Sequence, residues 1–191
     1  MNRRLFAAAL SALLLTGVSA LAQSSSWAID TNHTQVNFQV RHMGVSNVRG
    51  SISGVSGTVV WDAKDPSKSS VDATITTKTV TTNNERRDAD LRSPNFFDVE
   101  KYPTMTFKST SVTNANGKLQ VVGDLTLNGV TKSVTLDIDG PTAPQKGQHD
   151  KLVIGLSAAG TLKRSDFNFA PKYAAVLGDE IPFTIDVEAD K

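Results

Sequence analysis

Apolar and polar residues alternate along most of the chain from Trp27 onward. In the segment 34–42, for example, Val36, Phe38 and Val40 fall on one face of an extended strand, and polar or charged residues lie between them. This period of two is typical of a β-strand with one buried face. The pattern recurs over 51–62, 69–77, 102–108, 118–127, 133–138, 152–162 and 181–187. It predicts an all-β protein.

The segment 51–62 follows a stretch that contains glycine and has glycine within it as well. Residues 43–50, with Gly44 and Gly50, separate it from the first strand and are expected to interrupt the extended structure. Gly54 and Gly57 lie inside the segment itself. Glycine within a strand indicates a bulge, a sharp bend or the close approach of another group.

Two Asn-Gly pairs mark tight turns between consecutive strands. They are Asn116-Gly117 and Asn128-Gly129, and this dipeptide is a strong hairpin signal. Strands joined by hairpins pair antiparallel, and a sheet of this size with one apolar face must close into a barrel or stack in two layers. We therefore expect a roughly eight-stranded antiparallel β-barrel.

The interior of this barrel is expected to be hollow. Many predicted inward positions carry Val, Ala, Gly, Leu or Met rather than large rings. An eight-stranded barrel is wide enough either to be filled by its side chains or to hold one small ligand. Inward side chains of modest size favour the ligand, and a filled barrel that acts as a structural or interaction module is the alternative.

The segment 83–99 breaks the alternation and is expected to be a crossover between strands. Asn84 or Asn83 is a suitable cap for a short helix, with Glu85 near its positive end. Pro94 should end that helix by Arg92 or Ser93. The segment finishes with two phenylalanines, Phe96 and Phe97, which either belong to a functional lid or plug one end of the β core.

The first 22 residues are predicted to be a secretory signal peptide. Arg3 and Arg4 precede an apolar run, and Ala20 and Ala22 are small residues of the kind that a signal peptidase reads. Cleavage after Ala22 leaves 23–191 as a single domain in the periplasm. The run is too short for a stable membrane anchor, so no stable membrane insertion is expected.

The charge balance and the residue inventory exclude several functions. Without residues 1–22 the chain has 18 basic and 19 acidic residues, a formal charge of −1, which gives no reason to expect a nucleic-acid partner. The chain has no Cys and three histidines, His33, His42 and His149. His33 and His42 have opposite parity and should point to opposite faces of one strand. Neither a metal site nor a cofactor is predicted.

Three blocks of sequence together resemble the YceI-like lipid-binding family. They are 33–44, continuing to 48–50; 84–99, followed by 102–107; and 123–132, with a weaker echo at 164–167 and 178–180. Asp90 and Asn95 depart from the residues that the family often has there. The resemblance implies an exported bacterial protein with a lipocalin-like barrel that binds a long isoprenoid or other lipid chain and catalyses no reaction.

The inward residues of several strands are the predicted ligand contacts. His42, Arg49, Arg87 and Asp88 are the candidates for the barrel mouth or a head-group contact. The basic and acidic residues of 86–88 could hold an anionic or carbonyl head group, or could form an Arg–Asp pair that locks the crossover. The predicted lining residues are Phe38, Val40, Met105, Phe107, Val121, Leu125, Leu127, Leu136, Ile154 and Leu156.

The expected function is the storage or transport of a lipid, namely a polyisoprenoid, an isoprenoid quinone or a fatty-acid derivative. No Gly-x-Ser-x-Gly elbow or other catalytic motif is present, so the chain is not predicted to be an enzyme. The alternative is an isomerase or hydrolase that acts on a lipid in the same cavity, with His42 and Asp88 as its acid or base. A homodimer is left open.

Overall fold

The computed structural model describes residues 24–191. The predicted signal peptide, 1–22 with cleavage after Ala22, lies outside the described residues. The described part contains eleven strands, one α-helix and five short 3₁₀ turns. The strands are β1 (Ser25–Ile29), β2 (Gln35–His42), β3 (Ser46–Ile52), β4 (Val55–Trp61), β5 (Ser70–Thr76), β6 (Thr104–Ala115), β7 (Lys118–Leu127), β8 (Val130–Asp139), β9 (Gln145–Lys146), β10 (Leu152–Lys163) and β11 (Glu180–Asp190), and the helix is α1 (Glu85–Arg92).

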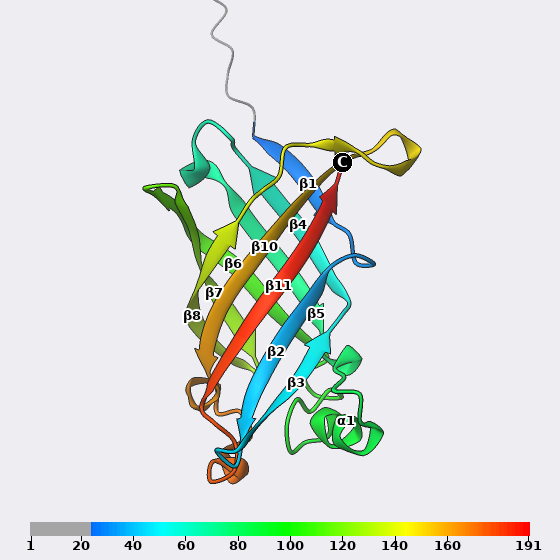
Figure 1. The fold of residues 1–191 in the computed structure, drawn as a ribbon, viewed down its shortest axis with the longest axis vertical. Coiled ribbons are helices and arrows are strands. Elements are labelled where there is room, and N and C mark those ends of the chain that lie inside the picture. Colours follow the sequence, from blue (N-terminus) through cyan, green and yellow to red (C-terminus); the bar gives the residue numbers. More distant parts are fainter. Residues whose placement is uncertain (1–23) are drawn as a thin grey trace, which may run out of the picture.

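The strands form a closed barrel of eight antiparallel strands, because β1 with β2 and β3 with β4 each act as one long strand (Figure 1). β1 and β2 pair with successive parts of the same edge of β11. β4 and β3 pair with β1 and β2 in the same way. From β4 the sheet continues through β5, β6, β7, β8 and β10, and the pairing of β10 with β11 closes it. The predicted fold class is confirmed.

The hairpins form where the Asn-Gly pairs predict them. Asn116 and Gly117 have φ values of 54° and 78°, and Asn128 and Gly129 have 53° and 76°. Two consecutive residues with positive φ make the turn whose twist matches that of the flanking strands. These local turns set the register of β6, β7 and β8, and the alternation then directs their apolar residues to the inside.

The structure differs from the sequence prediction between residues 43 and 62. The expected interruption is shorter, since β3 already begins at Ser46, and the expected single strand is divided between β3 and β4. Gly54 lies at the break with a φ of 72°. Gly57 has a φ of 141°, and a side chain there would collide with the backbone of Asp72 on β5. A bend and a close approach therefore both occur.

The crossover between β5 and β6 carries α1, as predicted. The Asn84 side-chain oxygen accepts a hydrogen bond from the Arg87 backbone N–H at 3.0 Å, and Ser93 caps the other end. The crossover lies beside β3 at one end of the barrel, which we call the α1 end (Figure 1). In the described part of the chain, no helix has the length and apolar character needed to cross a membrane.

Candidate ligand-binding cavity

A cavity of about 420 Å³ occupies the barrel interior. This volume lies within the range of about 300–1,000 Å³ that is usual for small-molecule sites. Aliphatic residues, phenylalanine and methionine line it almost throughout. Among the described residues, the exceptions are His42, Thr82, Arg87, Asp90, Arg164 and Tyr173. The interior is therefore a hollow lined mainly by hydrocarbon.

Most of the residues predicted as ligand contacts line this cavity. Ile154 differs, because it is 2% exposed and lies opposite Ala189 in the packed part of the core. The lining includes Phe38, Val40, Met105, Phe107, Val121, Leu125, Leu127, Leu136 and Leu156. Whether these residues touch a ligand stays a prediction.

The end of the barrel away from α1 is packed solid. Five residues are buried there and contribute nothing to the cavity lining, namely Trp27, Val112, Leu119, Ile154 and Ala189. The Lys191 ammonium lies 4.3 Å from the centre of the Trp27 ring and covers it. A ligand therefore has to enter from the α1 end or between the strands.

The polar lining residues come from segments at the α1 end (Figure 1). Thr82, Arg87 and Asp90 belong to the β5–β6 crossover. Arg164 and Tyr173 belong to the 3₁₀ turns Arg164–Phe167 and Pro171–Tyr173, which connect β10 to β11, and His42 ends β2. The cavity thus has one polar end and one apolar end.

Arg49, predicted near the mouth, is placed elsewhere. It is exposed, while its neighbour Val48 faces the cavity. Successive side chains of a strand point to opposite faces, so Arg49 lies on the outer wall. His42 and Arg87, in contrast, do line the cavity.

Asp88, the last of the mouth candidates, is buried in the crossover and does not line the cavity. Its carboxylate accepts hydrogen bonds from the Thr82 N–H at 2.8 Å, the Thr82 hydroxyl at 2.5 Å and the Thr81 hydroxyl at 2.9 Å. Burial raises the pKa of Asp88, but these hydrogen bonds outweigh burial and leave the pKa below its ordinary value.

The Arg87 guanidinium reaches Thr82 from the other side. Its Nε donates to the Thr82 hydroxyl at 2.7 Å, and Nη2 donates to the Thr82 carbonyl at 3.0 Å. The expected Arg–Asp pair is therefore replaced by a chain of hydrogen bonds in which Thr82 joins Arg87 to Asp88. This arrangement holds the first turn of α1 against the strand-like segment before it.

Arg164 organises the second segment at the α1 end. Its side chain is buried, and its guanidinium donates to the carbonyls of Phe169 at 3.1 Å and Ala170 at 3.4 Å. Within the described residues, its Nε has no hydrogen-bond partner, and Asp179 lies 4.0 Å away. The Ser165 hydroxyl hydrogen bond is the main reason that the pKa of Asp179 is lowered.

Four aromatic residues join the two segments and narrow the mouth. Phe96 stacks on Tyr173 with ring centres 4.8 Å apart, and Phe97 meets Phe169 edge-on at the same separation. All four residues line the cavity. Phe96 and Phe97 therefore lie at one end of the barrel and contribute to the cavity wall, and their role as a functional lid stays a prediction.

Sequence reasoning did not select Arg164, Phe169 or Tyr173 as site residues. They lie in a segment without periodicity, where no strand pattern shows which side chains point inward. The available signal is the short motif Arg164–Phe167, which resembles the family but does not indicate a role.

Comparisons with known proteins agree with this architecture. A model of the YceI-like domain matches residues 27–189. Protein YceI of Salmonella arizonae is 38% identical over 192 residues, covering 98% of this chain and 97% of that protein.

Two solved structures extend the comparison. A YCEI protein of Campylobacter jejuni is 35% identical, with a TM-score of 0.68 over 77% of this chain and 86% of that one. A polyisoprenoid binding domain from Saccharophagus degradans has a TM-score of 0.62 over 85% of this chain and 97% of that one. It is 14% identical, so it is similar in fold.

Proposed function

The chain belongs to the YceI-like family, and we propose that it is a lipid-binding protein that holds a long apolar chain inside its barrel. The candidate ligands are a polyisoprenoid, an isoprenoid quinone and a fatty-acid derivative. The role is storage or transport of that lipid.

The observation that carries this proposal is the hydrocarbon lining of the 420 Å³ cavity. Burial contributes about 0.8 kcal/mol for each CH₂ group removed from water. A long chain can therefore be held by burial alone, without a set of directed polar contacts. The similarity in fold to a domain described as polyisoprenoid binding supports the same class of ligand.

The polar end of the cavity gives the ligand an orientation in this proposal. The apolar tail extends towards the packed end, and the polar head lies near Arg164 and Tyr173. A buried guanidinium nitrogen without an acceptor is costly. The Arg164 Nε is such an atom among the described residues, and an oxygen of the head group would satisfy it.

The location we propose is the periplasm, after removal of residues 1–22. The intact mass of the protein recovered from a periplasmic fraction tests this, and we expect a chain that starts at Gln23. A membrane-bound form that retains the apolar run would contradict the proposal.

The alternative of an enzyme acting on a lipid has less support. It was based on His42 and Asp88 as acid or base, and Asp88 is turned away from the cavity into hydrogen bonds with Thr81 and Thr82. Of this pair, only His42 lines the cavity. We therefore propose binding without catalysis.

Mass spectrometry of an organic extract of the purified protein tests the function. We expect a long-chain lipid in near-stoichiometric amount, and much less of it from a Leu136→Trp variant prepared in parallel, because Leu136 lines the cavity. Equal amounts from both proteins would show that the lipid is adventitious. An extract without lipid, together with no binding of long-chain fluorescent ligands, would favour the filled barrel.

A further inference from the structure

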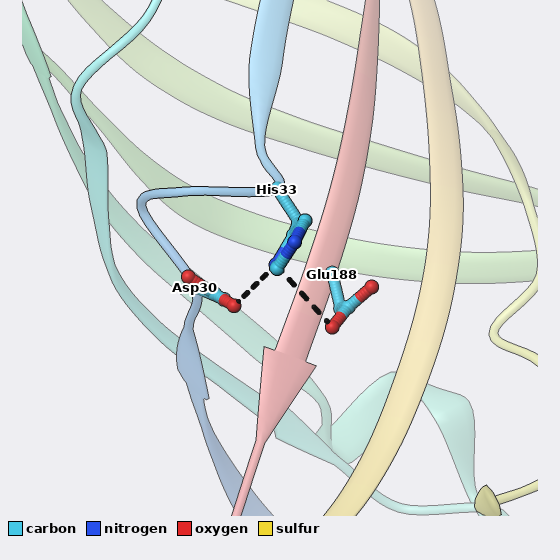
Figure 2. A group of neighbouring side chains, drawn as sticks. All are labelled: Asp30, His33 and Glu188. Atoms are coloured by element: carbon cyan, nitrogen blue, oxygen red, sulfur yellow. Dashed lines mark hydrogen bonds and ion pairs between the residues drawn. The ribbon is translucent and has the colours of Figure 1, made fainter. Parts of the chain in front are cut away.

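Three side chains converge on the outside of the barrel, where the turn between β1 and β2 faces β11 (Figure 2). Asp30 and His33 come from the turn between β1 and β2, and Glu188 comes from β11. The His33 Nδ1 lies 2.7 Å from Asp30 Oδ2 and 3.7 Å from Glu188 Oε1. The ligand atoms that the three residues offer all lie within 4.8 Å of one another.

Backbone hydrogen bonds hold these residues in place. The Asp30 N–H donates to the Glu188 carbonyl at 2.8 Å, so the turn is tied directly to β11. The Thr34 hydroxyl donates to the same carbonyl at 3.3 Å and accepts a hydrogen bond from the Glu188 N–H at 3.2 Å. The Asn32 N–H donates to Asp30 Oδ1 at 2.8 Å and leaves Oδ2 turned towards the imidazole. The turn, the Asp30 carboxylate and the backbone at Glu188 are therefore held in place.

The charges at this position favour a cation. Nδ1 carries at most one proton, which it shares with Asp30, and Glu188 at 3.7 Å is beyond hydrogen-bond distance. When the imidazole is neutral, the two carboxylates of Asp30 and Glu188 leave the cluster with a net negative charge next to Nδ1.

We propose that Asp30 Oδ2, His33 Nδ1 and Glu188 Oε1 bind a divalent metal ion of the borderline class, with Zn²⁺ as the reference ion. One imidazole nitrogen with two carboxylate oxygens is a ligand set that suits Zn²⁺ and is less suited to the hard ions Mg²⁺ and Ca²⁺. Zinc bonds to nitrogen and oxygen are about 2.0–2.2 Å long, which places neighbouring ligand atoms roughly 3.3 Å apart. The observed separations of 2.7 Å and 3.7 Å lie on either side of that value.

The surroundings leave room for the remaining coordination positions. His33 is 64% exposed, and the adjoining outer groove of about 350 Å³ is also lined by Asp139, Asp186 and Glu188. Water can therefore complete the coordination from the groove. β1 and β2 pair with successive parts of the same edge of β11, and the turn between them lies where the two strands meet. An ion bound there would link this turn to β11 and so stabilise the pairing of β1 and β2 with β11.

Calorimetric titration with ZnCl₂ tests the proposal on the purified, untagged chain after treatment with EDTA. We expect saturable binding of one Zn²⁺ and a melting temperature that rises with Zn²⁺ concentration. His33→Ala and Glu188→Gln should each weaken binding by at least about tenfold. His149→Ala and Glu180→Gln are the matched controls, since both residues are exposed and lie outside the cluster, and they should bind as the unaltered chain does.

Glu188→Gln distinguishes metal binding from stabilisation of the turn by the Asp30–His33 hydrogen bond alone. Glu188 takes no part in the Asp30–His33 hydrogen bond, so this variant leaves that bond and the turn in place. Loss of Zn²⁺ binding and of the Zn²⁺-dependent melting shift in a folded Glu188→Gln protein supports the site. Absence of saturable binding by the unaltered chain, or unchanged binding by Glu188→Gln, would reject the site and leave a plain His–Asp pair.

Discussion

Phe183 on β11 lies directly opposite Gly160 on β10, and its ring fills the space that a side chain at Gly160 would need. A Cβ atom placed on Gly160 would lie 2.7 Å from the Phe183 Cζ atom. Phe38 covers Gly50 on β3, and Phe107 covers Gly123 on β7, in the same manner. Each ring therefore leans across a glycine of the neighbouring strand and lies along the wall, which leaves the middle of the barrel open.

Gly160→Ala is expected to reduce the capacity of the cavity. The new methyl group forces the Phe183 ring towards the lumen, at a cost in stability of about 1–3 kcal/mol. Binding of a series of fluorescent fatty acids should weaken most for the longest chains. Gly155→Ala on the same strand is the control, because the nearest atoms to its Cβ lie 3.9 Å away. Equal chain-length dependence in both variants would contradict the role of the ring.

Leu125→Trp and Ile154→Trp should have opposite effects, although both residues face inward. Leu125 lines the cavity, so the indole occupies space that lipid would fill, and lipid uptake should fall with little loss of stability. Ile154 lies in the packed end, where overpacking typically costs about 1–3 kcal/mol. Urea unfolding and ligand titration of both lipid-free variants distinguish them. Destabilisation by Leu125→Trp with unchanged binding would reject the cavity lining.

Asp88→Ala should lower stability without weakening ligand binding. It removes the acceptor of three hydrogen bonds and leaves the buried Thr82 N–H unpaired, which costs about 2–3 kcal/mol. Arg87→Ala should also reduce stability more than ligand affinity, but by less than Asp88→Ala, since Arg87 is exposed. Melting and titration of the same samples compare the two effects. An unchanged melting temperature with much weaker binding in Arg87→Ala would instead assign Arg87 to the head group.

The contribution of Asp88 should depend on pH. Its pKa in the folded protein is lowered from 3.8, so the ionised form stabilises the fold above pH 3.8 and this stabilisation is lost as the pH falls through the folded-state pKa. The difference in unfolding free energy between the unaltered chain and Asp88→Asn should therefore be largest near neutral pH and shrink in acid. Urea unfolding at several pH values measures it, and a difference independent of pH would contradict this assignment.

Tyr173→Ala should speed ligand exchange. Its ring stacks on Phe96 across the mouth, and such an aromatic pair contributes about 0.5–1.5 kcal/mol. Losing it should raise the release rate of a fluorescent lipid about two- to tenfold, as measured by stopped-flow displacement. Tyr173→Phe keeps the ring and should release at the original rate. If both variants release at the same altered rate, the hydroxyl and not the stacking controls the mouth.

Local signals in the sequence predicted most of the strands, the two Asn-Gly hairpins, and a short helix capped by Asn83 or Asn84. The structure places that helix after Asn84 and ends it at Arg92. These features depend on neighbouring residues, whose spacing along the chain is also their spacing in space. The same alternation correctly directed Phe38, Leu125 and Leu156 to the inside of the barrel.

The tertiary structure decided how deep in the barrel each inward residue lies and which residues it contacts, because the alternation of apolar and polar residues carries no information on either. Leu156 and Ile154 share a face, and their different positions along the barrel axis place one in the cavity and the other in the packed end. The alternation also does not predict that Thr82 bridges Arg87 and Asp88, or that Glu188 lies beside His33. These contacts form only when the chain is folded. Alternation determines which face a side chain occupies, whereas depth in the barrel and partners from distant strands depend on how the sheet closes.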